Sequence, residues 1–463
     1  MVLKLIYDVK DKPKFGQLII FAFQQLLAIM AATIAVPAIV GNGMTASAAL
    51  FGAGVGTIVY LLFTKFNSPV FLGSSFAFIG SMFSAFAGAG TYAALGFLGL
   101  ILGAIFAGLV YVLIAIIVKL AGVKWINKIM PAVVIGPTVA IIGLSLAGNA
   151  VGDMLKTDTQ AADAGANYIA LICGLVTLLV VTLCSVYGKK GVRLIPFIIG
   201  IICGYIVALI FTFIGIKTGN ASLQIIDFAP FKALFADGVT FGSFISLPEF
   251  TFVKAMDGFK HLNAGYVGTI AAAYIPVAFV VFAEHIADHK NLSSIIERDL
   301  LEDPGLSRTL LGDGVGSMAG AVFGGCPNTT YGESVGCVAI TKNASVLTIF
   351  ATSILAMLIS FVSPFVALLD SIPSCVMGGV CITLYGFIAV SGLKMIQKVD
   401  LEDNKNLFVV SSILIAGIGG LSLTFTFGQD TTITITSVAC ALILGIILNL
   451  ILGGKKKKAA EDK

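Results

Sequence analysis

The chain has 463 residues, of which 58% are hydrophobic and only 11% are charged, and its mean hydropathy is +1.03. A water-soluble domain cannot cover its surface with so few polar side chains, so the composition excludes that class and indicates a polytopic membrane protein. The formal net charge of +4 is not a nucleic-acid signature.

Apolar segments long enough to cross a bilayer recur along the whole chain. A helical crossing needs about 17–25 predominantly apolar residues, and fourteen segments approach this length, two of them short and interrupted. We therefore predict an all-α polytopic fold with fourteen transmembrane segments, at about residues 17–37, 46–64, 69–88, 92–118, 131–150, 167–187, 194–216, 263–288, 309–325, 333–345, 347–369, 373–392, 405–424 and 430–452.

The positions of the basic residues agree with this count. Lys and Arg in short loops stay on the cytoplasmic side of a membrane. With the N-terminus inside, nine of the 28 basic residues fall in the two tails and fourteen in the even-numbered connections, leaving five outside. We therefore expect a multi-pass protein of the cell membrane with both termini in the cytoplasm, and the run Lys455 to Lys458 could contact anionic lipid.

The longest connection, about residues 217–262, divides the chain into two sets of seven segments. Because seven is odd, the second set must lie upside down relative to the first, and such inverted repeats are common in secondary transporters. The predicted organisation is a first repeat, an extracellular connection, a second inverted repeat and a basic cytoplasmic tail, at residues 1–216, 217–262, 263–452 and 453–463.

One stretch, residues 325–336 (GCPNTTYGESVG), is far more polar than the apolar region around it. Ionisable residues and broken backbone inside a membrane are tolerated where they are buried in protein or line a cavity. We interpret this stretch as a substrate site at the end of a half-helix. The alternative is a loop outside the membrane, and the apolar runs on both sides leave little room for one.

The first repeat contains a counterpart of this stretch. Residues 73–78 (GSSFAF) in the third segment match residues 328–333 (NTTYGE) in the tenth, and both follow a proline, Pro69 or Pro327. Paired interruptions in corresponding segments point to a transporter's binding site. Short extended pieces there would present backbone N–H and C=O groups to a ligand, with half-helix N-termini behind them. A chance match of Ser and Thr in glycine-rich helices is the alternative.

The eight cysteines lie mostly inside apolar runs and none forms a C-x-x-C pair, while the three histidines form no ligand-like cluster. We expect the cysteines to be small core residues rather than metal ligands or disulfide partners, and we predict no metal site and no cofactor. The cysteines are Cys173, Cys184, Cys203, Cys326, Cys337, Cys375, Cys381 and Cys440.

Several motifs, in order and in the expected segments, resemble the nucleobase/ascorbate transporters, also called the nucleobase:cation symporter-2 family. The tenth segment carries Glu333-Ser334-Val335-Gly336 followed by Thr341-Lys342, which is similar to the signature of that family. Four further motifs resemble the bacterial uracil permeases of this family in particular. They are FLGSSFAF (residues 71–78), AEH (283–285), ERDLLEDPGLSRTLLGDG (297–314) and PNTTYGE (327–333). The resemblance covers essentially the whole chain.

The resemblance implies a site and a mechanism. Glu284 matches a glutamate that pairs with the pyrimidine ring, and Glu333 matches the glutamate beside it. The implied fold has a core domain that holds the site and a gate domain that moves against it, often as a homodimer. Two short strands supply main-chain groups and aromatic packing, and other positions surround the pocket: Phe76, Tyr331 and Gly332 in the strands, with Ala32 and Tyr385 at the periphery.

The chain departs from the family pattern at two positions. The first segment reads Gln24-Gln25 where a Gln-His pair is common, and Asp288, followed by His289, stands where some uracil permeases have a histidine. The roles of those histidines therefore cannot be carried over.

The chemistry of the candidate site can also be argued from the residues. Uracil presents alternating N–H donors and C=O acceptors, so its receptor needs carboxylate acceptors interleaved with backbone donors. Two nearby carboxyl groups in a low dielectric cannot both ionise cheaply, which makes one a natural proton carrier. Our hypothesis is that protonation of Glu284 or Glu333 neutralises the site and couples proton entry to substrate entry, with His285 or Asp288 as a relay.

Plainer interpretations exist for several of these residues. Asp288 and His289 are expected at the solvated cytoplasmic end of the eighth segment, which favours a loop role over a relay. Glu333 could be a structural acid at a helix N-terminus. Near segment ends, Asp313 and Asp430 are expected to be interfacial or capping residues, and Trp125 is expected to be an interface anchor.

Three classes of function are consistent with a polytopic chain. The first is a proton-coupled uracil importer. The second is a transporter of another cargo, such as xanthine, uric acid or another purine, or an anion. An anion carrier should have a basic residue or only helix dipoles at its site, and the two glutamates argue against that. The third is a channel or membrane enzyme, but no water-lined stripe, metal cluster or nucleophile-base pair is visible. We therefore predict a transporter and not an enzyme, and the coupling ion, H⁺ or Na⁺, stays open.

Overall fold

A computed structural model of the chain describes residues 5–122, 131–159, 166–236, 238–427 and 431–461. The predictions for Trp125 and Asp430, and those for the side chains of Lys455 to Lys458, fall outside the described part.

Helices dominate the structure, and each of the fourteen predicted segments contains one. In the described residues, eight helical stretches are long and apolar enough to cross a membrane. The number of crossings stays a prediction, because the other helices are shorter or less apolar. The eight are α1 (Phe15–Val40), α2 (Ala46–Phe63), α4 (Ala93–Ala121), α6 with α7 (Ala132–Ser145 and Ala147–Met154), α8 (Tyr168–Tyr187), α10 (Pro196–Thr218), α13 (Ala264–Ile296) and α18 (Ser374–Ile396).

The other helices complete the bundle. Those within predicted segments are α3 (Ile79–Ala89), α14 (Leu306–Gly324), α15 (Gly332–Thr341), α16 (Val346–Ile359), α17 (Ser363–Asp370), α19 (Asn404–Ile418) and α20 (Ser437–Glu461). The connections hold short helices and helical turns, namely α9 (Lys190–Leu194), η2 (Ala221–Leu223), α11 (Ala229–Leu234), η3 (Phe241–Ser243), α12 (Thr251–Ala255), η4 (Met256–His261) and η5 (Leu301–Gly305).

Two short strands break the third and tenth segments and pair with each other. Strand β1 (Leu72–Ser74) is antiparallel to β2 (Asn328–Thr330), with Gly73 opposite Thr329. After β1 the chain continues through the turn η1 (Phe76–Phe78) into α3, and after β2 it continues into α15. Two half-helices therefore begin at one buried strand pair.

The extended backbone at the strand pair is satisfied inside the protein, as a membrane environment requires. Thr57 on α2 accepts a hydrogen bond from the Leu72 N–H (2.9 Å) and donates one to the Leu72 carbonyl (3.1 Å). The Asn328 side chain donates to the Gly52 carbonyl (3.0 Å). Glycine is needed here, because a Cβ at Gly73 would lie 2.3 Å from the Tyr331 ring.

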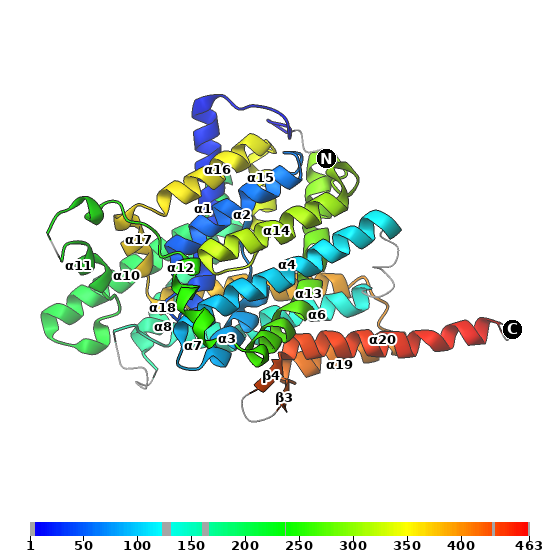
Figure 1. Cartoon of the computed structure of the whole chain (residues 1–463). Coiled ribbons are helices and arrows are strands. Elements are labelled where there is room, and N and C mark those ends of the chain that lie inside the picture. Colours follow the sequence, from blue (N-terminus) through cyan, green and yellow to red (C-terminus); the bar gives the residue numbers. More distant parts are fainter. Residues whose placement is uncertain (1–4, 123–130, 160–165, 237, 428–430, 462–463) are drawn as a thin grey trace.

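A second strand pair was not predicted. Strands β3 (Leu423–Phe427) and β4 (Thr431–Ile435) form an antiparallel hairpin between α19 and α20, at the lower edge of Figure 1. The prediction of helix through 405–424 and 430–452 is wrong at this junction. The sequences LTFTF and TTITI are rich in β-branched and aromatic residues, and most of their positions alternate Thr with Leu, Phe or Ile, which is a strand pattern.

The helices fall into two groups. The first contains α1 to α4 and α13 to α16 around the β1–β2 pair, where α4 packs on α13 and α14, and α16 packs on α1 and α2. The second contains α6 to α8, α10 and α18 to α20, where α6 packs on α18, α8 on α10, and α19 on α20. Figure 1 shows α2, α4, α14 and α16 of the first group running side by side.

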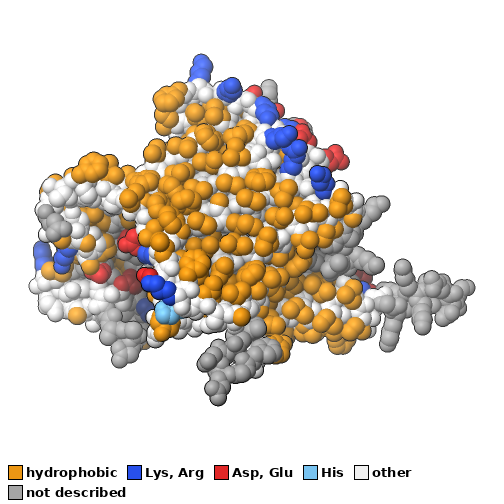
Figure 2. Space-filling model, in the orientation of Figure 1, with side chains coloured by type: hydrophobic (Ala, Val, Ile, Leu, Met, Phe, Trp, Pro, Cys, Tyr) orange, Lys and Arg blue, Asp and Glu red, His pale blue; other side chains and the backbone are white. Residues whose placement is uncertain are grey.

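The outer surface is apolar over a broad area. Figure 2 shows hydrophobic side chains covering the central part of the visible face, with Lys, Arg, Asp and Glu gathered at its upper right edge and at its left side. Large exposed hydrophobic residues recur along whole helices, for example Ile202, Ile206 and Ile210 on α10. Such a surface suits lipid contact and not water.

Candidate functional site

A cavity of about 350 Å³ lies between the two groups of helices. One wall is polar and belongs to the first group. It consists of Ser75, Phe76, Ala77, Glu284, Ala287, Asp288 and residues Thr329 to Glu333. The opposite wall is largely apolar and belongs to the second group. It consists of Val139 and Ile142 on α6, Phe197 on α10, and Leu384, Phe387, Ile388, Ser391 and Met395 on α18.

The structure brings together most of the residues that the sequence singled out for substrate binding. Glu284, Glu333, Gly332, Tyr331 and Phe76 all line the cavity, although they come from α13, α15, the end of β2 and η1. Side chains from segments that are distant in sequence therefore converge on one space.

Two predicted pocket residues do not line this cavity. Ala32 on α1 is buried, with 1% of its surface exposed, and Tyr385 on α18 is 2% exposed. Tyr385 packs its ring edge-on against Phe76, with the ring centroids 6.0 Å apart. It therefore supports a lining residue instead of facing the space itself.

The strand β2 and the start of α15 form the most polar part of the wall. Tyr331 is the residue before α15, and its hydroxyl donates to the Ser74 carbonyl on β1 (2.7 Å). Gly332 leaves open space, since a Cβ there would meet only Asp288 Oδ1, at 3.9 Å. Glu333 lies in the first turn of α15, where the helix dipole favours a negative charge.

Three carboxyl groups face the cavity, and no Lys or Arg is among its lining residues. Glu284 and Asp288 are one turn apart on α13, and Glu333 faces them from α15. Thr330 on β2 donates to Asp288 Oδ2 (2.7 Å). Three charged carboxylates without cationic partners are very costly away from water. The cavity therefore suits a ligand rich in N–H donors, or a bound proton that neutralises one of the carboxylates.

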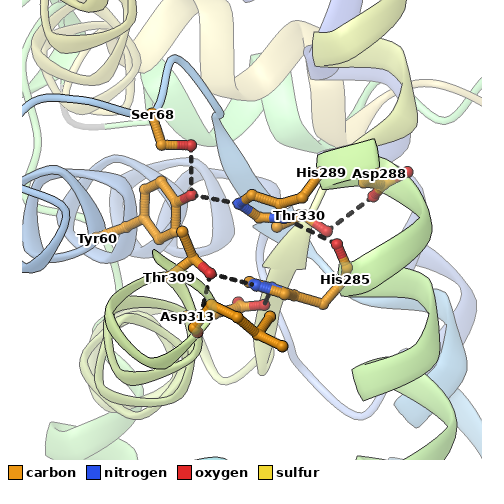
Figure 3. Close-up of polar contacts among 9 residues, drawn as sticks. Tyr60, Ser68, His285, Asp288, His289, Thr309, Asp313 and Thr330 are labelled. Atoms are coloured by element: carbon orange, nitrogen blue, oxygen red, sulfur yellow. Dashed lines mark hydrogen bonds and ion pairs between the residues drawn. The ribbon is translucent and has the colours of Figure 1, made fainter. Parts of the chain in front are cut away.

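His285 and His289, in contrast, point away from the cavity into a separate buried network (Figure 3). The Nδ1 atom of His285 lies 2.6 Å from Asp313 Oδ2, and its Nε2 atom lies 3.0 Å from Thr309 Oγ1. His289 Nε2 lies 2.7 Å from the Tyr60 hydroxyl, which is hydrogen-bonded to Ser68 (2.7 Å). The two imidazole rings stack, with centroids 4.0 Å apart.

This network corrects three expectations. Asp288 and His289 do not lie in a solvated loop, because α13 continues to Ile296, about two turns further; Asp288 faces the cavity and His289 is fully buried. Asp313 is not an interfacial or capping residue. It lies within α14 with 1% of its surface exposed.

Gln25 is buried and does not line the cavity. Its side-chain amide donates to Ser334 Oγ (2.7 Å), and Ser334 Oγ also accepts from the Phe71 N–H (3.2 Å). Gln25 thus links α1 to α15 and to the chain before β1, behind the polar wall. In the sequence, a polar Gln25 inside an apolar segment indicates a buried hydrogen bond, but it does not identify Ser334 as the partner.

Comparisons with known proteins agree with this architecture. A sequence model described as Permease family matches residues 16–426. The chain belongs to this permease family. The uracil permease of Bacillus caldolyticus is 37% identical over 458 residues, which cover 98% of this chain and 96% of the relative. That of Bacillus subtilis (strain 168) is 37% identical over 460 residues (99% and 98%), and that of Escherichia coli (strain K12) is 34% identical over 447 residues (96% and 93%).

The family assignment confirms the resemblance to the nucleobase/ascorbate transporters and their bacterial uracil permeases. The chain is therefore a multi-pass membrane protein and a transporter, not an enzyme.

Solved structures show the same fold at low sequence identity. The transmembrane domain of the cyanobacterial bicarbonate transporter BicA matches with a TM-score of 0.62 and 14% identity, covering 96% of this chain and all of that domain. The murine anion transporter Slc26a9 in its inward-facing state matches with a TM-score of 0.62 and 11% identity, covering 96% of this chain and 69% of that one. At these identities the match concerns the fold alone.

Proposed function

We propose that this permease is a proton-coupled symporter that imports a nucleobase, with uracil as the preferred cargo, across the cell membrane by alternating access. The observation that carries the proposal is the cavity wall on which Glu284, Asp288 and Glu333 converge with the ends of two strands. The names of the relatives, uracil permeases at 37% identity over nearly the whole chain, support the choice of cargo.

The wall matches the hydrogen-bonding pattern of a pyrimidine. Uracil offers N–H donors that need carboxylate acceptors, and carbonyl oxygens that need N–H donors. Glu284 and Glu333 supply the acceptors, and the backbone near Phe76 and Gly332, at the starts of two helices, supplies donors. The aromatic rings of Phe76 and Tyr331 offer surfaces for a planar ring.

Alternating access is supported by the origin of the two walls. In our proposal the first group of helices is the core domain and the second is the gate domain, so movement between them would open and close the cavity. The helix contacts also suit fourteen segments in two inverted repeats. The fourth segment, α4, packs on α13 and α14 of the second repeat, and its counterpart α16 packs on α1 and α2 of the first. Corresponding segments also pack on each other, α2 on α14 and α6 on α18. Cytoplasmic termini, a homodimer and lipid contacts belong to the same proposal.

Proton coupling follows from the acidic wall. A core that carries several uncompensated negative charges would cross the membrane barrier at a high cost. A proton taken up by Glu284 or Glu333 reduces the negative charge of the core when the cargo is bound. Asp288, on the same wall, is the neighbouring acid that could relay this proton. His285 lies on the same helix behind the wall and can tune the acids only indirectly, since it does not line the cavity.

An alternative within the same fold is a transporter of xanthine, another purine or another nucleobase, coupled to H⁺ or Na⁺. The cavity volume of about 350 Å³ has room for a bicyclic base. The hydroxyl and amide oxygens near Asn328 would be the candidate ligands of a sodium ion.

The test is uptake of labelled uracil into proteoliposomes under an inward proton gradient without sodium, challenged with unlabelled uracil, xanthine or hypoxanthine. We expect gradient-dependent uptake that only uracil blocks, and Glu284→Gln should abolish it. Competition by purines alone would move the cargo to the alternative, a sodium requirement would replace the ion, and unchanged proton-driven uptake by Glu284→Gln would refute its role.

A further inference from the structure

A second, very small cavity lies behind the substrate cavity, on the other side of strand β2. Its volume of about 10 Å³ is the space that one water-sized molecule occupies. Its polar lining comes from three elements: Tyr111 on α4, Asp313 and Ser317 on α14, and Asn328 and Thr329 on β2. Thr329 lines both cavities, so this space is separated from the substrate site by a single strand.

Two polar atoms at this small cavity have no hydrogen-bond partner among the described residues. They are Asp313 Oδ1 and the Tyr111 hydroxyl, and their residues are only 1% and 4% exposed. Leaving a buried polar atom without a hydrogen-bond partner destabilises a fold, and such atoms are rare in native proteins. The phenol is a donor and the carboxyl oxygen is an acceptor, so a single molecule between them could satisfy both.

The charge of the surrounding groups decides what that molecule is. Where Thr309 Oγ1 donates its one hydrogen to the Leu306 carbonyl (3.1 Å), its oxygen accepts a hydrogen bond from His285 Nε2 (3.0 Å). The short contact between His285 Nδ1 and Asp313 Oδ2 then holds one further proton, on either partner. With Nε2 as the donor to Thr309, the Asp313–His285 pair is neutral overall wherever that proton lies. A neutral occupant suits this environment, whereas a cation would leave a net buried charge.

We propose that one ordered water molecule occupies this cavity, accepting a hydrogen bond from the Tyr111 hydroxyl and donating one to Asp313 Oδ1. The water joins α4 to α14 and extends the Asp313–His285 pair to the rear of β2. It belongs to the structure of the core domain, so the proposal does not depend on which substrate the protein carries.

Two buried tyrosines allow a matched test. Tyr274 also has a buried hydroxyl without a partner among the described residues, but it does not line this cavity. Removing a truly unpaired hydroxyl should leave stability unchanged or slightly higher, while removing a water-bonded one should lower it. We therefore expect Tyr111→Phe to lower the melting temperature of the purified protein by about 1–2 °C, and Tyr274→Phe not to lower it. Equal behaviour of the two variants would overturn the proposal.

A sodium ion is the competing occupant, and melting curves in sodium and potassium chloride separate the two. A water molecule predicts the same melting temperature in both salts. Stabilisation by sodium that Asp313→Asn removes would replace the water by an ion. If Tyr111→Phe does not fold, a high-resolution map of the unaltered protein decides. A peak within hydrogen-bonding distance of Asp313 Oδ1 and the Tyr111 hydroxyl supports the water, and the absence of a peak refutes it.

Discussion

The two strand-helix units at the centre of the molecule share one architecture and differ in chemistry. In the first unit, β1 leads through η1 into α3, and in the second, β2 leads into α15. In the sequence alignment of the two units, Phe78 stands where Glu333 stands in the second. Phe78 is buried and stacks on Tyr274, whereas Glu333 faces the cavity. Two units of the same architecture can thus place a charged group on one side of the cavity only.

The largest difference between the two units should appear at Glu333 and Phe78. We expect Glu333→Gln to weaken uracil binding by about 10–100-fold, because a hydrogen bond to a charged group contributes about 1.5–3 kcal/mol. Phe78→Leu should lower the melting temperature but change uracil affinity less than about 2-fold, since it only alters packing. Isothermal titration with uracil and melting curves on both variants measure this. Equal losses of affinity would mean that Glu333 acts only structurally.

The strand interruptions and the acids could be predicted because they are local features. Prolines, glycines and hydroxyl residues inside apolar runs are visible in any window, and so are Glu284 and Glu333. The apolar wall could not be predicted in the same way. Phe387 and Met395 belong to a helix that is hydrophobic on all sides, so periodicity does not indicate which side faces a cavity.

The buried network behind the cavity escaped prediction for a related reason. Asp313 and His285 are 28 residues apart on different helices, and neither has a local pattern that names the other. The sequence predicts an interfacial or capping position for Asp313, because the predicted ninth segment begins only at residue 309. In the structure α14 begins at Leu306, and its glycines allow close packing against α2 and α4, which buries the carboxyl group.

The glycines of the two units offer a second comparison. A Cβ at Gly73 would lie 2.3 Å from the Tyr331 ring, while a Cβ at Gly332 would meet only Asp288 Oδ1 at 3.9 Å. We expect Gly73→Ala to destabilise the protein by about 1–2 kcal/mol through overpacking of the strand pair. Gly332→Ala should fold normally and affect uptake instead, because its methyl group enters the cavity. Size-exclusion profiles with melting curves test the first expectation, and transport assays test the second. Normal stability of Gly73→Ala would show that the strand pair can adapt.

The smallest expected effect concerns the hydroxyl groups of the strands. Thr330 donates to Asp288 Oδ2, and its counterpart in the first unit is Ser75, which also lines the cavity. Removing the Thr330 hydroxyl takes one hydrogen bond, worth about 0.5–1.5 kcal/mol, from a carboxyl group on the polar wall. Thr330→Val keeps the shape of the side chain and removes only the hydroxyl group. It should lower uracil affinity about 2–10-fold and shift the pH dependence of uptake. The control variant Ser75→Ala should leave the pH dependence of uptake unchanged. The pH profile is the decisive measurement, because a lost packing contact would lower affinity equally at every pH. If both variants shift the profile by the same amount, Asp288 is not tuned by Thr330, and the two strands would be chemically equivalent at this position.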